Sequence, residues 1–213
     1  MDQLSHVATI IALTMGTAWA SGINLYAAVL MLGIMGMSGG VQLPPDLQIL
    51  ANPAVLLAAG FMYVVQFVAD KIPGVDTGWD TLHTFVRIPA GAVLAAGAAG
   101  AVDPSLSPAA ALVGGGVAAV SHAAKSGTRI VINASPEPFS NWAASVSEDV
   151  MVVGGLWMAL NHPFLFLALF VCFIALMIWL LPKIWSGVKK VFRFIFNLFR
   201  SKEHMPHQPP RQE

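Results

Sequence analysis

Four ionisable side chains share one face of a helix that the sequence predicts after the segment "DKIPG". They are separated by four, three and four residues: Asp76, Asp80, His83 and Arg87. This is the spacing of side chains on a single helical face. Carboxylates at this spacing can bind a cation or a proton, and a histidine can change its charge near physiological pH. The chemistry predicted for this face is therefore the binding of an ion or a small polar group.

Polar residues with helical spacing recur in most other segments of the chain. In chain order they are Ser21, Asn24, Asp70, His122, Lys125, Arg129, Asn133, Asn141, Glu148 and Asp149, and Glu137 joins them from a break between two prolines. Each charge held at membrane depth costs about 3 kcal/mol unless it is paired or hydrated. The polar faces are therefore expected to turn toward one another, and we predict that these residues line one polar site with the first four.

The predicted site contains more acids than bases. Six acids are set against four bases: Asp70, Asp76, Asp80, Glu137, Glu148 and Asp149 against Lys71, Arg87, Lys125 and Arg129. A functional interpretation is a cavity open to the cytoplasm, whose acidic excess serves a cation, a proton or a polar head group. A structural interpretation is an ion-pair network that only fixes the register of the helices.

The composition is that of an integral membrane protein. Of the 213 residues 56% are hydrophobic and 10% charged, and the mean hydropathy is +0.71, whereas soluble domains are about 25% charged. We predict an all-α, polytopic helical bundle with about six transmembrane segments. The apolar segments are 6–37, 53–70, 88–102, 108–124, 142–160 and 163–182.

Several of these helices are expected to be broken. The first segment would be roughly 45 Å long as one helix, against a bilayer core of about 30 Å. It must tilt or break, and Ser21-Gly22 is the expected break. Further breaks are predicted at "KIPG" and "NASPEPFSNW", and the pattern leaves room for an inverted repeat. The predicted domains are a bundle over 1–182, a basic amphipathic cytoplasmic helix over 183–200 and a disordered tail over 201–213.

The distribution of lysine and arginine predicts an orientation. With six spans, all basic loops and the tail from Lys183 fall on the side of the termini, whereas the loops around "GVQLPPDLQIL", "VDPSLS" and "NHP" carry no basic residue. The positive-inside rule then places both termini in the cytoplasm. We expect a multi-pass protein of a bacterial inner membrane, with the lipid bilayer as its partner and no nucleic acid. The small-residue runs "AGAVLAAGAAGA" and "LVGGGVAAV" also permit homo-oligomers.

Five motifs carry a resemblance to a known family. They are "ASGINLYA", "FVADKIPGVDTGWDTLHTFVR", "SHAAKSGTR", "NASPEPFSNW" and "SED". Across about residues 15–160 the chain resembles a bacterial integral-membrane family catalogued as domain of unknown function 4126. The resemblance implies that the polar segments are the functional features. It implies no substrate.

Three functions compete at this stage. The first is a small transporter or channel-like binding protein for an ion or a small polar substrate, and it requires no cofactor. The second is a membrane-embedded enzyme, in which Asp76, Asp80 and His83 would hold a divalent metal and Lys125 and Arg129 a phosphate. The sequence contains no His-Glu-x-x-His pair, Gly-x-Ser-x-Gly elbow or Walker loop to support it. The third is a noncatalytic membrane scaffold.

Overall fold

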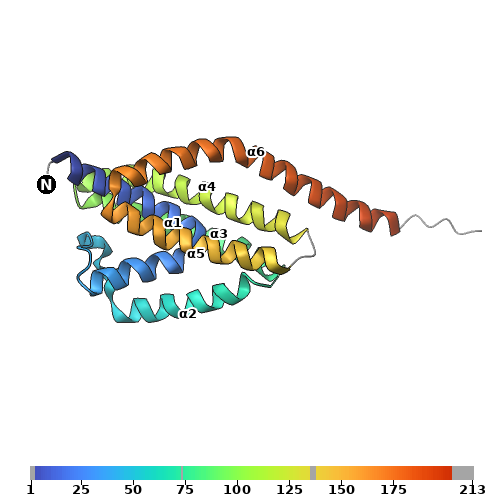
Figure 1. The fold of residues 1–213 in the computed structure, drawn as a ribbon, viewed down its shortest axis with the longest axis horizontal. Coiled ribbons are helices and arrows are strands. Elements are labelled where there is room, and N and C mark those ends of the chain that lie inside the picture. The colour runs from blue at the N-terminus through green and yellow to red at the C-terminus, as the bar shows by residue number, and fades with distance from the viewer. Residues whose placement is uncertain (1–2, 73, 135–137, 203–213) are drawn as a thin grey trace, which may run out of the picture.

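The protein is an all-helical bundle. The computed structural model describes residues 3–72, 74–134 and 138–202, and within these ranges it contains no β-strand. The helices are α1 (Gln3–Met37), the 3-10 helix η1 (Pro45–Ala51), α2 (Pro53–Ala69), α3 (Val75–Gly100), the 3-10 helix η2 (Pro104–Leu106), α4 (Ser107–Asn133), α5 (Pro138–Asn161) and α6 (Pro163–Lys202). The predicted all-α fold is confirmed (Figure 1).

The number and type of apolar helices agree with a polytopic membrane bundle. In the described part of the chain, 5 helices are long and apolar enough to cross a bilayer, and the pair η1–α2, bent by 65°, brings the number to 6. The charged faces belong to the spans themselves: α3 begins at Val75 rather than at residue 88, and α4 continues to Asn133 rather than 124. The short apolar segments are thus completed by polar residues that face inward.

α1 does not run straight through the bundle but folds back at Asn24. Its backbone is non-helical there (φ −145°, ψ 92°). Val7, near its start, lines a pocket with Val102, just beyond the end of α3. Gly33, near its other end, packs against η1, which in turn packs against α3 at Gly97. A straight helix of 35 residues would be about 52 Å long, so its two ends could not both lie at the same end of α3.

The return of α1 corrects the predicted position of its break. The break lies at Asn24 instead of Ser21-Gly22, because the side chain of Asn24 can cap a new helix whereas Ser21 is bonded into the bundle. α1 starts and ends at one end of the bundle, and the C-terminal end of α6 lies at the opposite end (Figure 1).

The hairpin of α1 fills only one half of the bundle. Small residues allow this close packing: a Cβ on Gly22 would collide with Ser121 and with the backbone of Ala118, and one on Gly114 would collide with Ala95. Leucine and alanine side chains form the surrounding core. The other half of the bundle, beyond the apex at Asn24, is the half that contains the polar residues.

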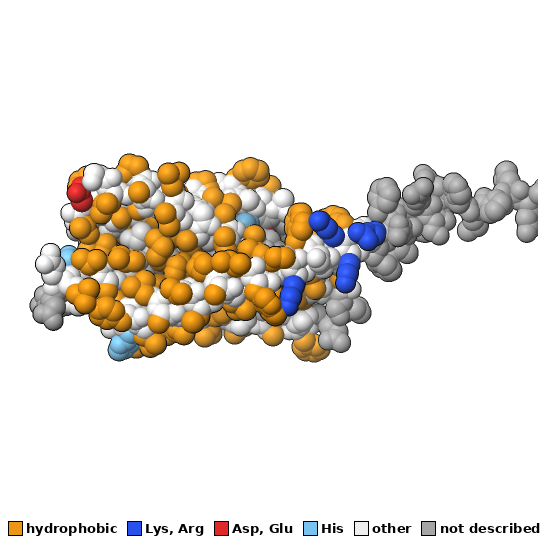
Figure 2. All heavy atoms as spheres, turned by 90° about the horizontal axis from the view of Figure 1, so that it is seen from above, with side chains coloured by type: hydrophobic (Ala, Val, Ile, Leu, Met, Phe, Trp, Pro, Cys, Tyr) orange, Lys and Arg blue, Asp and Glu red, His pale blue; other side chains and the backbone are white. Residues whose placement is uncertain are grey.

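The outside of the bundle is apolar and its basic residues gather at one end. Figure 2 shows hydrophobic side chains along the visible face, with lysine and arginine at the end where α6 leaves the bundle. Lys183, Lys189, Lys190 and Arg193 are exposed there, while Val188 is buried. α6 continues through Pro182 without interruption and includes residues 201 and 202 of the predicted tail. Residues 203–213 lie outside the described residues.

Candidate functional site

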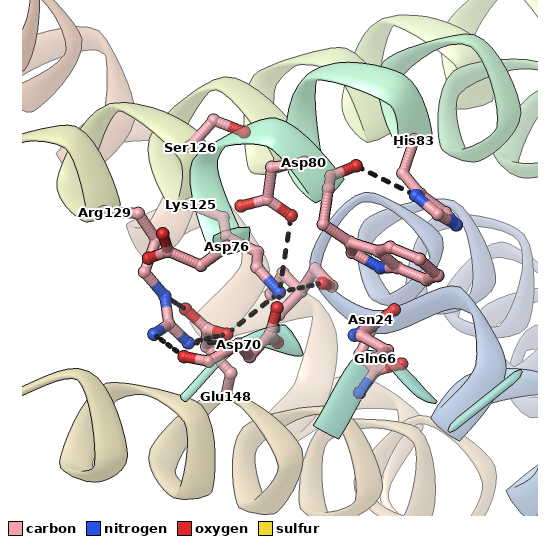
Figure 3. A network of polar contacts seen from close by, with 12 residues as sticks. Asn24, Gln66, Asp70, Asp76, Asp80, His83, Lys125, Ser126, Arg129 and Glu148 are labelled. Carbon is pink, nitrogen blue, oxygen red and sulfur yellow. Dashed lines mark hydrogen bonds and ion pairs between the residues drawn. The ribbon is translucent and has the colours of Figure 1, made fainter. Parts of the chain in front are cut away.

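Six oppositely charged side chains form a network in the half of the bundle that α1 does not reach. It is hereafter called the ion-pair core and consists of Asp70, Asp80, Arg87, Lys125, Arg129 and Glu148. Asp70 follows α2, while the others project from α3, α4 and α5, so four helices contribute. Figure 3 labels each of these residues except Arg87. Five of the six side chains are at most 4% exposed, and Glu148 is 12% exposed. Sequence reasoning placed all six in one site, and the structure brings them together.

Lys125 lies at the centre of the ion-pair core. Its ammonium is 3.0 Å from Asp70 Oδ2, 3.1 Å from Glu148 Oε2 and 3.8 Å from Asp80 Oδ1. It also donates a hydrogen bond to the backbone carbonyl of Ile23 (3.2 Å). That carbonyl belongs to the last turn of the first half of α1, where the negative end of the helix dipole attracts a cation. Lys125 therefore joins the break in α1 to three carboxylates.

Asn24 and Asp149 complete the other side of the break. Asn24 Oδ1 accepts a hydrogen bond from the backbone N–H of Ala27 (3.1 Å), as the N-cap of the second half of α1 does. Asn24 Nδ2 donates to Asp149 Oδ1 (2.7 Å), and Tyr63 donates to Asp149 Oδ2 (2.8 Å). The Asp149 carboxylate thus stands near the positive end of a half-helix. Each half-helix end is matched by the side chain of opposite charge, Lys125 or Asp149.

Arg129 fastens the ion-pair core to the backbone. Its Nε and Nη2 donate to the two oxygens of Glu148 at 3.2 and 2.9 Å, a bidentate pair. Its Nη1 donates to the carbonyls of Asp70 (3.0 Å) and Asn141 (3.1 Å). The planar guanidinium therefore holds the end of α2 and the start of α5 against α4.

Arg87 occupies the deepest position of α3 within the network. Its Nη1 donates to Asp80 Oδ1 at 2.8 Å and to His122 Nδ1 at 3.3 Å, and its Nη2 donates to Gln66 Oε1 at 3.1 Å. Its backbone carbonyl accepts a hydrogen bond from Ser21 (2.8 Å), which places the first half of α1 beside α3. The predicted residues His122 and Ser21 are therefore partners of Arg87.

A separate cluster, hereafter called the end cluster, lies at one end of the bundle and consists of Asp76, Asn133 and Asn141. Asp76 Oδ1 accepts hydrogen bonds from the backbone N–H groups of Gly74 (2.9 Å) and Thr77 (2.6 Å) at the start of α3. Asn133 Nδ2 lies 2.8 Å from both Asp76 oxygens, and Asn141 donates to Asn133 Oδ1 at 2.6 Å. The ends of α3, α4 and α5 are thereby tied by neutral donors around one carboxylate.

The metal triad of the enzyme hypothesis is not assembled. Both ring nitrogens of His83 have other partners, since Nε2 lies 2.9 Å from the Tyr26 hydroxyl and Nδ1 lies 2.9 Å from the Trp79 carbonyl. The carboxylates of Asp76 and Asp80 belong to the end cluster and to the ion-pair core respectively. No group of three or more His, Cys, Asp or Glu side chains in the described residues could hold a metal ion.

A comparison with known protein families identifies the family of the chain. Residues 11–183 match the family described as Domain of unknown function (DUF4126). The chain belongs to this family. No curated protein and no solved structure matches the chain. The family therefore accounts for the resemblance of the motifs and leaves the activity to be argued from the site.

The charge balance of this DUF4126 site differs from the sequence count. Within the described residues, the ion-pair core contains three carboxylates and three basic groups. Lys71 stands apart, with its ammonium over the ring of Phe67, where desolvation lowers its pKa. Glu137 lies outside the described residues. The acidic excess is therefore carried by Asp76 and Asp149, whose hydrogen-bond partners among the described residues are neutral donors.

Some polar atoms of the network remain without a partner. Among the described residues, Asp70 Oδ1, Asp80 Oδ2, Gln66 Nε2 and Arg87 Nε are buried and make no hydrogen bond. Such groups are costly in a dry interior, so they indicate a place that water or an ion can enter.

Sequence reasoning missed two neutral members of the site. Tyr26 binds His83, and Thr84 Oγ1 lies 2.8 Å from His122 Nε2. Thr84 stands at helical spacing between Asp80 and Arg87, which is a usable signal. Tyr26 has no comparable signal, because its role follows from the position of the α1 hairpin.

Proposed function

We propose that the protein transports protons or a small cation across the membrane through the site at the apex of α1. The observation that carries this proposal is the break of α1 inside the bundle, with Lys125 on the end of one half-helix and Asp149 at the start of the other. Broken helices whose half-helix ends face charged groups are the form in which transporters build ion sites at membrane depth. A helix that served only as an anchor would gain nothing from this break.

The distribution of carboxylates supports a cation or a proton as the cargo. Asp149 is held by Asn24 and Tyr63, and it forms no ion pair with a described residue. Asp70 Oδ1 and Asp80 Oδ2 add two buried acceptors that have no hydrogen-bond partner among the described residues. Intramembrane carboxylates with unused acceptor capacity mark ion and proton pathways. The transported proton or cation would pass from the end cluster at Asp76 to Asp149.

The basic residues support an orientation. The C-terminal end of α6, with its exposed lysines and arginine, would face the cytoplasm of a bacterial inner membrane. The end cluster would then open to the cytoplasm, since it lies at the loops that join α2 to α3 and α4 to α5. The N-terminus would lie on the opposite side because α1 returns to where it began. The helix continuing from Lys183 would rest on the anionic surface of the inner leaflet.

A structural scaffold is the second candidate. It is favoured by the equal numbers of acids and bases in the ion-pair core, since a balanced network can hold helices in register without moving anything. The scaffold gives Asp149 no task beyond its hydrogen bonds, whereas the transporter needs its charge.

Purified protein in sealed liposomes separates the two. With a pH indicator inside the vesicles and an imposed pH or cation gradient, we expect the gradient to decay faster than in protein-free liposomes. Equal decay in both, for protons and for Na⁺ and K⁺, contradicts transport and leaves the scaffold.

A further inference from the structure

We infer that the groove between α5 and α6 binds a membrane lipid whose head group donates hydrogen bonds. Two adjoining pockets of ≈ 310 and ≈ 320 Å³ form this groove. They share Trp19, Met151 and Phe173 in their linings, so they lie side by side. The inference deepens the proposed function, because it names a lipid that would bind beside the same site. It rests on the proposed function only in that the lipid would contact Lys125 and Glu148 of that site.

The pocket that contains Lys125 and Glu148 is a consequence of the short reach of α1. Because α1 turns back at Asn24, none of the described helices fills the space between α4 and α5 beyond that level. α6 lies over this space, and Ile184 of α6 packs directly on Gly127 of α4. The pocket that remains has Trp19 and Ile23 of α1 at its inner side.

The two ends of the groove differ in chemistry. One end is lined by Gly154, Met158, Phe166 and other apolar residues, with no charged side chain. The other end is mostly apolar as well, through side chains such as Leu176, Leu180 and Ile184, but it also contains Lys125, Glu148 and the hydroxyl residues Thr128 and Ser147. An apolar channel that ends at polar groups fits a hydrocarbon chain with a polar head.

The direction of this polarity matches a lipid in a bilayer. Lys125 and Thr128 belong to the last third of α4, toward the end of the bundle where α6 leaves it. Phe166 lies at the start of α6, toward the other end. A lipid of the leaflet at the α6 exit would therefore place its head at the polar end and its chain toward the bilayer centre.

The hydrogen-bond inventory selects the kind of head group. The ammonium of Lys125 donates hydrogen bonds to Ile23 O and Asp70 Oδ2 and forms an ion pair with Glu148 Oε2 at 3.1 Å. Within the described residues, Glu148 Oε1 accepts one hydrogen bond, from Arg129 Nε, and so can accept another. An ammonium or hydroxyl head can donate to this oxygen. An anionic head would face a carboxylate without a free cation beside it.

The test is lipid retention by delipidated protein, measured by native mass spectrometry. Three lipids with identical acyl chains are added separately: phosphatidylethanolamine, diacylglycerol and phosphatidylcholine, the last of which has no N–H or O–H in its head. We expect at least tenfold stronger retention of one or both donor lipids than of phosphatidylcholine. Comparing the retention of phosphatidylethanolamine with that of diacylglycerol distinguishes an ammonium head group from a hydroxyl head group. Equal retention of all three, or of none, overturns the inference.

A matched pair of variants locates the bound lipid. A Cβ on Gly154, in the apolar end of the groove, or on exposed Gly116 of α4, outside it, meets no atom within 4 Å. Gly154→Leu fills the groove and should abolish the selective retention, whereas Gly116→Leu should leave it unchanged. Equal effects of both place the lipid elsewhere and overturn the assignment. Binding is measured without any gradient, so its failure is distinct from a failure of transport.

Discussion

Replacing Lys125 by methionine tests whether the ion-pair core is held together by its central cation. Methionine keeps the length and apolar stem of lysine and removes the charge. Asp70 Oδ2 loses its contact at 3.0 Å and keeps only Arg129 at 3.9 Å, and Glu148 loses its contact at 3.1 Å. Three carboxylates then remain with two guanidinium groups. Removing one partner of a buried ion pair costs about 3–5 kcal/mol, and we expect a loss of unfolding free energy in this range.

The double variant Lys125→Met/Asp70→Asn restores equal numbers of acids and bases. Arg129 keeps Glu148 and Arg87 keeps Asp80, so we expect recovery of about 0.5–3 kcal/mol relative to the single variant. The assay is equilibrium unfolding in mixed micelles of increasing SDS content. Lys71→Met is the matched control, because Lys71 is half-buried over Phe67 and should lose about 1 kcal/mol or less. Equal losses for the Lys125 and Lys71 variants, or no recovery in the double variant, refute the reasoning.

Three further perturbations test the path of α1 and the orientation. Asn24→Ala removes the cap of the second half-helix and should cost about 0.5–2 kcal/mol in the same unfolding assay; an unchanged stability contradicts the cap. Gly22→Ala should cost about 1–3 kcal/mol, because its methyl group meets Ser121 and Ala118. Gly116→Ala, where a Cβ meets nothing, should be neutral or stabilising by about 0.4–1 kcal/mol, and equal effects of the two substitutions argue against close α1–α4 packing. In a Cys172→Ala background, a membrane-impermeant maleimide should label Asp103→Cys in intact cells and Lys71→Cys only after permeabilisation. The reverse pattern would invert the proposed orientation.

The membership of the site could be predicted because its residues obey simple spacing. Asp76, Asp80, His83 and Arg87 all turn inward from α3, as their helical face indicates. The cost of an unpaired charge in a bilayer predicts that these residues find opposite charges on other helices. Asp80 does, since Lys125 of α4 lies 3.8 Å from its Oδ1, whereas Arg87 pairs with Asp80 of its own helix.

The path of α1 could not be predicted from the same patterns. Its apolar residues continue without interruption through Asn24, so hydropathy registers one long span. The turn depends on contacts across the fold: Lys125 on the Ile23 carbonyl and Asp149 on Asn24. Topology counted from loops therefore takes α1 as a single crossing, whereas the structure has both of its ends at the end of the bundle opposite the exit of α6. The metal triad failed for a related reason, since spacing on a face does not reveal that His83 turns toward Tyr26 and Trp79.

The most direct test of the central claim compares two carboxylate substitutions in the liposome flux assay. Asp149→Asn keeps the size of the side chain at the break of α1 and removes its charge. We expect at least a tenfold loss of protein-dependent proton or cation flux. Asp46→Asn makes the same change at an exposed position of η1 and should leave the flux at the wild-type rate. Flux that survives in Asp149→Asn at the rate of Asp46→Asn would contradict a transport role for the site at the apex of α1.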